Sequence, residues 1–277
     1  MSADDDNSLK GIIIPPKPQI LVDLQTAGDD TNKIASLIEQ DPGISASVLK
    51  TINSPYFGIP NKVTSIHKAV LLLGIGSITN IVNALSLKFS LPGNQQEQLE
   101  EFWDSSMDVA KVAGAAAGLL KHCSRDLAYS VGLFHNCGIP LLMQKDQAYT
   151  DLIHQSYSSS NSIVSLEREK VGLDHALIGA KLCKLWNLND KLCCAIKHHH
   201  DDNRVYDLPN LSNESKSLIA ILQLSEHIAE VHRTLGRQTE DLHWEKNKKG
   251  IFERLGIIED DYQGIRDEIV EQALNNA

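Results

Sequence analysis

Apolar residues recur at helical spacing along almost the whole of this sequence, and that periodicity limits the fold more than any other feature. In the segment 31–40, for example, Ile34, Leu37 and Ile38 fall on one helical face. Valine-rich runs that alternate apolar and polar residues, which are typical of strands, are scarce. No segment recurs at the fixed period of a solenoid repeat. The sequence therefore predicts an all-α fold.

A stretch of turn-forming and polar residues, SLPGNQQEQ at 90–98, separates two sets of helical segments. We expect two packed helical bundles, residues 11–92 and residues 96–277, the second of which includes the C-terminal helices. In the first bundle, glycines 74 and 76 break a long apolar pattern into two helices. In the second bundle, the apolar pattern of residues 126–144 predicts one continuous helix.

The charge of the chain limits its partners. The 277 residues include 26 Lys and Arg and 36 Asp and Glu, which gives a net charge of −10. An acidic chain repels phosphate backbones, so we expect no nucleic-acid partner. The N-terminus lacks an apolar signal core, and no uninterrupted apolar run approaches the roughly 20 residues that span a bilayer. The five cysteines include no CxxC pair and are typical of reduced thiols. We predict a soluble, cytoplasmic protein without a membrane partner.

Four histidines are candidates for a metal site: His135, His175, His198 and His199. The last three lie on the apolar sides of predicted helices and near helix ends, where their rings can converge with His135. Neutral imidazole is a good ligand for Fe, Mn, Ni or Zn. Two other interpretations remain open. Each histidine can be a core residue whose ring nitrogen is hydrogen-bonded, and the run 198–200 can be a surface tract that binds metal adventitiously.

Longer motifs resemble a known family. The stretches IASLIEQDPGISASVLKTINSPYFGIPNKVTSIHKAVLLLGIGSITNIV, GLFHNCGIPLL and EREKVGLDHALIGAKLCKLWNLNDKLCCAIKHH are similar to HDOD domains, which are bacterial signalling domains. The resemblance runs from about residue 11 to at least residue 231. It implies an N-terminal helical bundle packed on a bundle like that of the HD superfamily of metal-dependent phosphohydrolases. Members of the HDOD family are mostly regulatory, and often lack the full set of metal ligands.

The resemblance also implies which metal ligands this chain has lost. The first histidine of the superfamily falls at Ser105, just after a Phe-Trp pair. The His-Asp dyad becomes His135-Asn136. An amide oxygen coordinates metals weakly, and it brings no negative charge to offset a dication. We therefore assign no catalytic residue and interpret His135 and Asn136 as a degenerate dyad.

Other ligand positions match. His175 and the pair His198-His199 fall where histidines occur in the related cyclic-dinucleotide hydrolases, and Glu226 falls at the position of a late aspartate. With His135, this set predicts a site for a single transition metal, although no cofactor is required by the pattern. A site for two metals is hard to build from these residues.

The expected function is a non-catalytic regulatory module that acts through contacts with signalling proteins or a small molecule. The alternative is a metal-dependent phosphohydrolase that acts on a phosphodiester or nucleotide, and a nucleic-acid-binding regulator is opposed by the net charge. The loop SPYFGIP offers a partner surface through Tyr56 and Phe57. The same two rings can instead pack on the core as part of a rigid turn.

Overall fold

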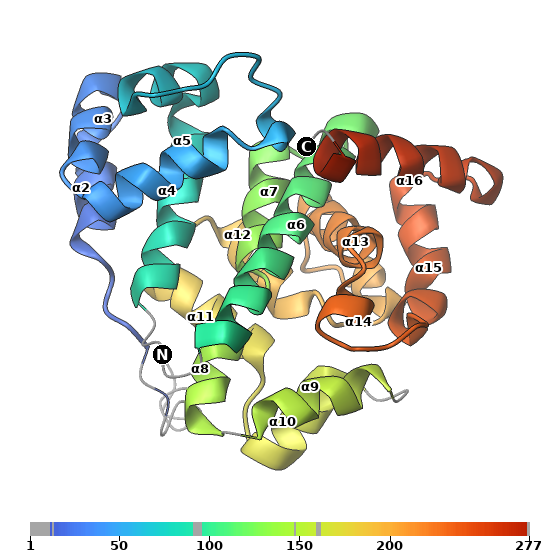
Figure 1. Ribbon diagram of the computed structural model, residues 1–277. Helices are drawn as coiled ribbons and strands as arrows, with labels where there is room; N and C mark the ends of the chain where they lie inside the picture. Colours follow the sequence, from blue (N-terminus) through green and yellow to red (C-terminus); the bar gives the residue numbers. More distant parts are fainter. Residues whose placement is uncertain (1–11, 13, 91–95, 147, 159–161, 276–277) are drawn as a thin grey trace. The chain divides into compact units, whose positions relative to one another are not determined.

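The computed structural model describes residues 12, 14–90, 96–146, 148–158 and 162–275. Within these ranges the chain forms helices and no strand, which confirms the predicted all-α fold (Figure 1). It divides into two compact units: residues 15–92 with the C-terminal segment that starts at residue 271, and residues 93–270 with the residues that precede residue 15. The expected bundles, 11–92 and 96–277, placed that C-terminal segment in the other unit. The boundary expected around residues 92–96 falls largely on residues 91–95, outside the described ones.

The smaller unit consists of short helices packed on one long helix. Aspartates begin two of the short ones: the Asp30 carboxylate accepts hydrogen bonds from two backbone N–H groups of α3, and the Asp41 carboxylate accepts one from α4. Both helices pack against α5, which Gly74 breaks with φ 77° and ψ 165°. The elements are α2 (Gln19–Ala27), α3 (Thr31–Glu39), α4 (Pro42–Ile52), η1 (Pro55–Phe57), α5 (Ile66–Ser90) and η4 (Glu271–Asn275).

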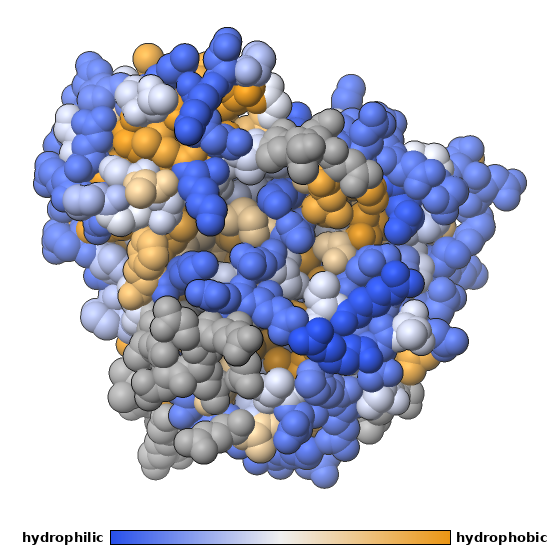
Figure 2. Space-filling model, viewed as in Figure 1, coloured by the Kyte–Doolittle hydropathy of each residue, from blue (hydrophilic) through white to orange (hydrophobic). Residues whose placement is uncertain are grey.

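Helix α5 is long and apolar enough to cross a membrane by length and composition alone. Half of its most apolar stretch is buried inside the structure, as expected for a core helix. Figure 2 shows hydrophilic residues over most of the face formed by α15 (Leu242–Leu255) and α16 (Tyr262–Val270) in the larger unit.

In the larger unit, α6 and α7 lie side by side at the centre and α13 packs against both (Figure 1). Small residues let α6 and α7 approach closely. A Cβ atom at Gly132 of α7 would lie 2.6 Å from the Cα atom of Ala110 in α6. The remaining elements are α6 (Gln96–Leu120), α7 (Arg125–Phe134), α8 (Ile139–Lys145), α9 (Tyr149–Tyr157), α10 (Ile163–Val171), α11 (His175–Leu185), α12 (Asp190–His198), η2 (Asn203–Asp207), α13 (Asn213–Ile228), α14 (Val231–Thr234) and η3 (Glu259–Asp261).

The expected single helix over residues 126–144 is wrong. The chain forms α7, a turn at residues 135–138, and then α8. Gly138 lies against the backbone of α11, where a Cβ atom would come within 2.1 Å of the His175 carbonyl oxygen. Pro140, in the first turn of α8, suits a new helix start. The turn therefore brings the segment that carries His135 and Asn136 next to the start of α11.

Candidate metal centre

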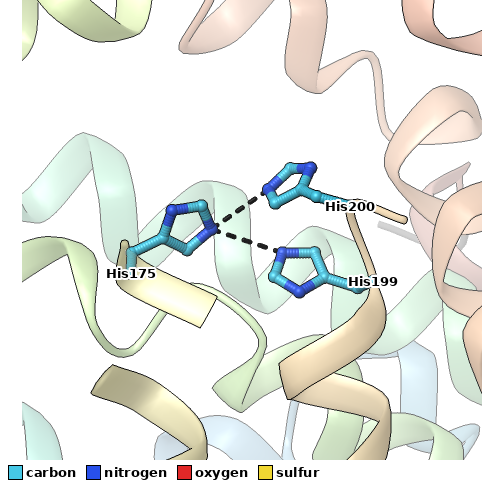
Figure 3. A group of neighbouring side chains, drawn as sticks. All are labelled: His175, His199 and His200. Atoms are coloured by element: carbon cyan, nitrogen blue, oxygen red, sulfur yellow. Dashed lines mark hydrogen bonds between the residues drawn. The ribbon is translucent and has the colours of Figure 1, made fainter. Parts of the chain in front are cut away.

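Three histidines meet inside the larger unit. His175 is the first residue of α11, whereas His199 and His200 directly follow α12. Figure 3 shows their rings pointing toward one another. The Nε2 atom of His175 lies 3.0 Å from Nε2 of His200 and 3.4 Å from Nε2 of His199. One ring nitrogen from each residue lies within 4.8 Å of the others, so one metal ion can contact all three.

Hydrogen-bond acceptors within the protein bind two of these rings at Nδ1, the ring nitrogen that faces away from the centre of the group. The Nδ1 atom of His175 donates to the carboxylate of Glu167 at 2.7 Å, and Nδ1 of His199 donates to the Ile196 carbonyl oxygen at 2.6 Å. These bonds fix the tautomer, so that each Nε2 atom faces the centre of the group. The orientation resembles that of metal-bound histidines, whose second ring nitrogen usually donates to a carboxylate or carbonyl oxygen.

Burial and neighbouring charges shift the pKa values of the three rings in different directions. Burial lowers the pKa of both His199 and His200, and the nearby imidazoles lower it further. Burial also opposes a charge on His175, but the carboxylate of Glu167 outweighs this effect and raises the pKa of His175. His199 and His200 are thus neutral near pH 7 and offer lone pairs. A metal ion must displace the proton held by His175, as is usual when imidazole becomes a ligand.

His135 and Glu226 lie beside this group. The Nδ1 atom of His135 donates to the Gly132 carbonyl oxygen at 2.6 Å, which leaves Nε2 directed away from its own helix. That Nε2 atom is buried without a hydrogen-bond partner among the described residues and lies 3.4 Å from Oε1 of Glu226. The rings of His135 and His199 are 5.4 Å apart, centre to centre. His135 and Glu226 therefore add a fourth imidazole and one carboxylate to the donors nearby.

The two positions interpreted as lost ligands are both buried. Asn136 is 5% exposed, and within the described part of the chain its side-chain oxygen has no hydrogen-bond partner. Ser105 is 8% exposed and lies on α6. Neither side chain brings a negative charge into the interior. The carboxylates described at this centre are those of Glu167 and Glu226, and Glu167 already accepts hydrogen bonds from His175.

The structure corrects the expected histidine pair by one residue. His198 lies at the end of α12, where Nδ1 is 2.7 Å from the carboxylate of Asp201. It is His200, together with His199, that faces His175. Tyr56 and Phe57 belong to the smaller unit. Their rings pack edge to face at 4.9 Å, both are partly buried, and η4 lies against the turn that contains them.

Glu167 was not predicted from the sequence. This residue is fully buried, and its carboxylate accepts hydrogen bonds from the Tyr149 hydroxyl and from both the backbone N–H and the ring of His175. In the sequence it belongs to the charged run EREK, which is typical of an exposed helix face. The only available signal is the apolar spacing of Ile163, Val164 and Leu166, whose buried face Glu167 shares.

A cavity of about 60 Å³ opens beside His199 and His200. A single water molecule needs about 10–15 Å³ of such space, so several waters or a small anion fit. The lining includes His199, His200 and Glu226 and continues to His227 and Asp241. The donors present fit a single first-row transition ion, because imidazole nitrogen predominates over carboxylate oxygen. The unpartnered Nε2 atom of His135 supports this fit, since a buried polar atom normally has a partner.

Comparisons with known proteins found a matching family model and a curated relative. The HDOD domain model matches residues 14–202. An uncharacterized protein of Treponema pallidum (strain Nichols) is 26% identical over 224 residues, which are 75% of this chain and 40% of that protein. This chain thus matches less than half the length of that curated relative.

Solved structures share the fold. An HDOD domain protein of unknown function from Geobacter sulfurreducens has a TM-score of 0.68 and 20% identity, with 97% of each chain covered. A candidate phosphohydrolase from Shewanella amazonensis SB2B has a TM-score of 0.66 and 21% identity over 98% of each chain. A candidate signal transduction protein from Marinobacter aquaeolei VT8 has a TM-score of 0.64 and 22% identity, covering 98% of this chain and 65% of the other. At these identities the likeness concerns the fold alone.

Proposed function

This chain belongs to the HDOD family, and we propose that it is a non-hydrolytic signal-transduction module that binds one transition-metal ion at His175, His199 and His200. The observation that carries the proposal is the meeting of three imidazole nitrogens within 4.8 Å of one another. His135 and Glu226 complete the set of donors around the ion. The module acts through contacts with signalling proteins or a small molecule.

The absence of two ligands is the reason for proposing regulation rather than hydrolysis. Two-metal hydrolysis relies on a pair of ions that clamp the attacking and leaving oxygens. In the HD superfamily a His-Asp dyad supplies a bridging carboxylate, but here the second residue is Asn136. Its neutral amide cannot offset the charge of a second dication, and Ser105 removes a further imidazole. One ion can be held by the three histidines, but a second ion bridged to it at the dyad position has no set of charged ligands.

A bound ion would act on the structure of the larger unit by joining its helices. The proposed ligands come from the start of α11, the segment after α12, the turn after α7, and α13. A ligand that binds only the folded arrangement stabilises it in proportion to its occupancy. The rigidity of this unit would thereby depend on whether metal is available, or on what occupies the adjacent cavity. Tyr56 and Phe57 remain a proposed contact surface for a protein partner.

Replacing His200 by glutamine is expected to weaken metal binding at this site by at least about 100-fold, because one of three imidazole ligands is lost. The matched control is His198→Gln, which changes the same side chain two positions earlier in the same run. His198 faces Asp201 and not the centre, so this variant should keep the wild-type affinity. The measurement is a Zn²⁺ or Co²⁺ titration of protein without an affinity tag. Equal affinities for His200→Gln and wild type would remove the basis of the proposal.

Hydrolysis remains the second candidate function. The carboxylate of Glu226, 3.4 Å from Nε2 of His135, favours it, as does the cavity that Glu226 lines together with His199 and His200. The Shewanella structure described as a candidate phosphohydrolase is similar in fold. Metal-dependent turnover of a phosphodiester or nucleotide that is lost in His135→Ala would establish this function in place of the regulatory one.

A further inference from the structure

A second group of side chains that can bind a metal lines the same cavity. His227 is near the end of α13, His232 is in α14, and Asp241 precedes α15. Their ligand atoms lie within 4.8 Å of one another. Oδ2 of Asp241 is 2.9 Å from Nδ1 of His227 and 3.5 Å from Nδ1 of His232. None of these residues belongs to the three-histidine site.

The two carboxylate oxygens of Asp241 have different partners. Oδ1 accepts the backbone N–H of Trp244 at 3.0 Å and so caps the start of α15. Oδ2 faces the two histidines. The cap thus accounts for one oxygen of this largely buried carboxylate. Oδ2 accepts a hydrogen bond from Nδ1 of His227 at 2.9 Å, and a bound cation would take the place of that hydrogen.

His232 provides an independent sign that the group lacks a ligand. Its side chain is 6% exposed, and Nδ1 is buried with no hydrogen-bond partner among the described residues. A buried polar atom that is left unpaired costs about 1–3 kcal/mol. That atom is directed toward Oδ2 of Asp241, and the 3.5 Å separation is too long for a good hydrogen bond. A metal ion bound by both atoms would satisfy the imidazole nitrogen.

The surrounding structure holds the group in place. The ring of His227 stacks on Trp244 with centres 4.1 Å apart and planes 4° from parallel. Between α13 and α14 the chain turns at Glu230, whose φ of 55° is left-handed, and this turn returns His232 toward His227. Rigid placement of ligands reduces the ordering that a metal would otherwise have to impose.

We propose that His227, His232 and Asp241 form a second site for a single divalent transition-metal ion. Two imidazoles and one carboxylate are a donor set that suits Fe²⁺ or Zn²⁺ and leaves coordination positions open. All three residues line the cavity that also contacts His199, His200 and Glu226. Water or a small anion in the cavity can fill the open positions. Because Glu226 and His227 are adjacent on α13, one helix carries a donor for each site.

The test uses Co²⁺ as the probe, titrated into metal-free protein that carries no affinity tag. Wild-type protein should bind two ions per chain. Asp241→Asn should remove one of them, with at least about 100-fold weaker binding, because the charged oxygen is lost. Its amide oxygen can still accept the Trp244 N–H, so the helix cap is retained. His232→Gln provides a second variant with the same expected loss, whereas His200→Gln should remove the other ion.

Asp30→Asn is the matched control, since it makes the same change at the N-cap of α3 and should leave both ions in place. If the three-histidine site binds nothing, wild-type protein should bind one ion, which Asp241→Asn removes. This result would refute the proposed function and support the second site. Identical Co²⁺ binding by wild type, Asp241→Asn and His232→Gln would overturn the second site, whatever the first one binds.

Discussion

Replacing Glu167 by alanine is expected to destabilise the folded protein by about 3–5 kcal/mol, the cost typical of removing one partner from a buried pair. The side chain is fully buried, and its carboxylate accepts hydrogen bonds from Tyr149 and from the ring and backbone of His175. Alanine would leave all of these donors without an acceptor in the interior. The measurement is urea unfolding of metal-free protein, compared through the free energy of unfolding.

The same variant should also weaken metal binding. Loss of an outer partner of a metal-bound histidine typically costs about 10–100-fold in affinity. The matched control is Glu169→Ala, which removes an exposed carboxylate from the same helix and should change stability by less than about 0.5 kcal/mol. If Glu167→Ala and Glu169→Ala were equally stable, the carboxylate could not be holding His175 as the structure shows.

Substituting alanine for Gly138 is expected to destabilise the protein by about 3 kcal/mol or more, at the upper end of the range for overpacked sites. The added Cβ atom would lie 2.1 Å from the carbonyl oxygen of His175, and the three atoms nearest to it are all backbone atoms of His175, which cannot rotate away. The turn and α11 must separate, which also moves His175 relative to His135. We therefore expect weaker metal binding together with the loss of stability, both measurable on the purified variant.

Gly264→Ala is the control for this substitution. Gly264 lies in α16, and a Cβ atom there would meet nothing within 4 Å. Alanine in a helix is favoured over glycine by about 0.5–1 kcal/mol, so this variant should be as stable as wild type or slightly more stable. A Gly138→Ala protein with wild-type stability and metal affinity would contradict the close packing of the turn on α11.

Local signals were sufficient to predict the fold class, because helix periodicity and helix breakers act within a few residues. The break at Gly74 is such a case: its left-handed φ is readily adopted by glycine. The turn at residues 135–138 was missed for the opposite reason. The apolar pattern continues through it, and what interrupts the helix there is the close approach of Gly138 to His175, 37 positions later in the sequence.

The site was predictable in part. The positions of His135, His175 and His199 agree with convergence on one centre. The pair after α12 was placed one residue too early, at His198 and His199, because the helical pattern extended through His198, where α12 ends. Glu167 was not predictable from its charged neighbours, since only the tertiary structure shows that its carboxylate is buried. The group of His227, His232 and Asp241 depends on the turn at Glu230, which no pattern in the sequence indicates.

Hydrolysis by metal-loaded protein tests the central claim most directly. Protein without an affinity tag would be loaded with Mn²⁺ or Fe²⁺, its bound metal measured, and its turnover of phosphodiesters and nucleotides compared with that of His135→Ala. With Asn136 and Ser105 at two ligand positions, we predict bound metal and no metal-dependent turnover above that variant. Turnover that requires the metal and disappears in His135→Ala would contradict the account and identify the protein as a phosphohydrolase.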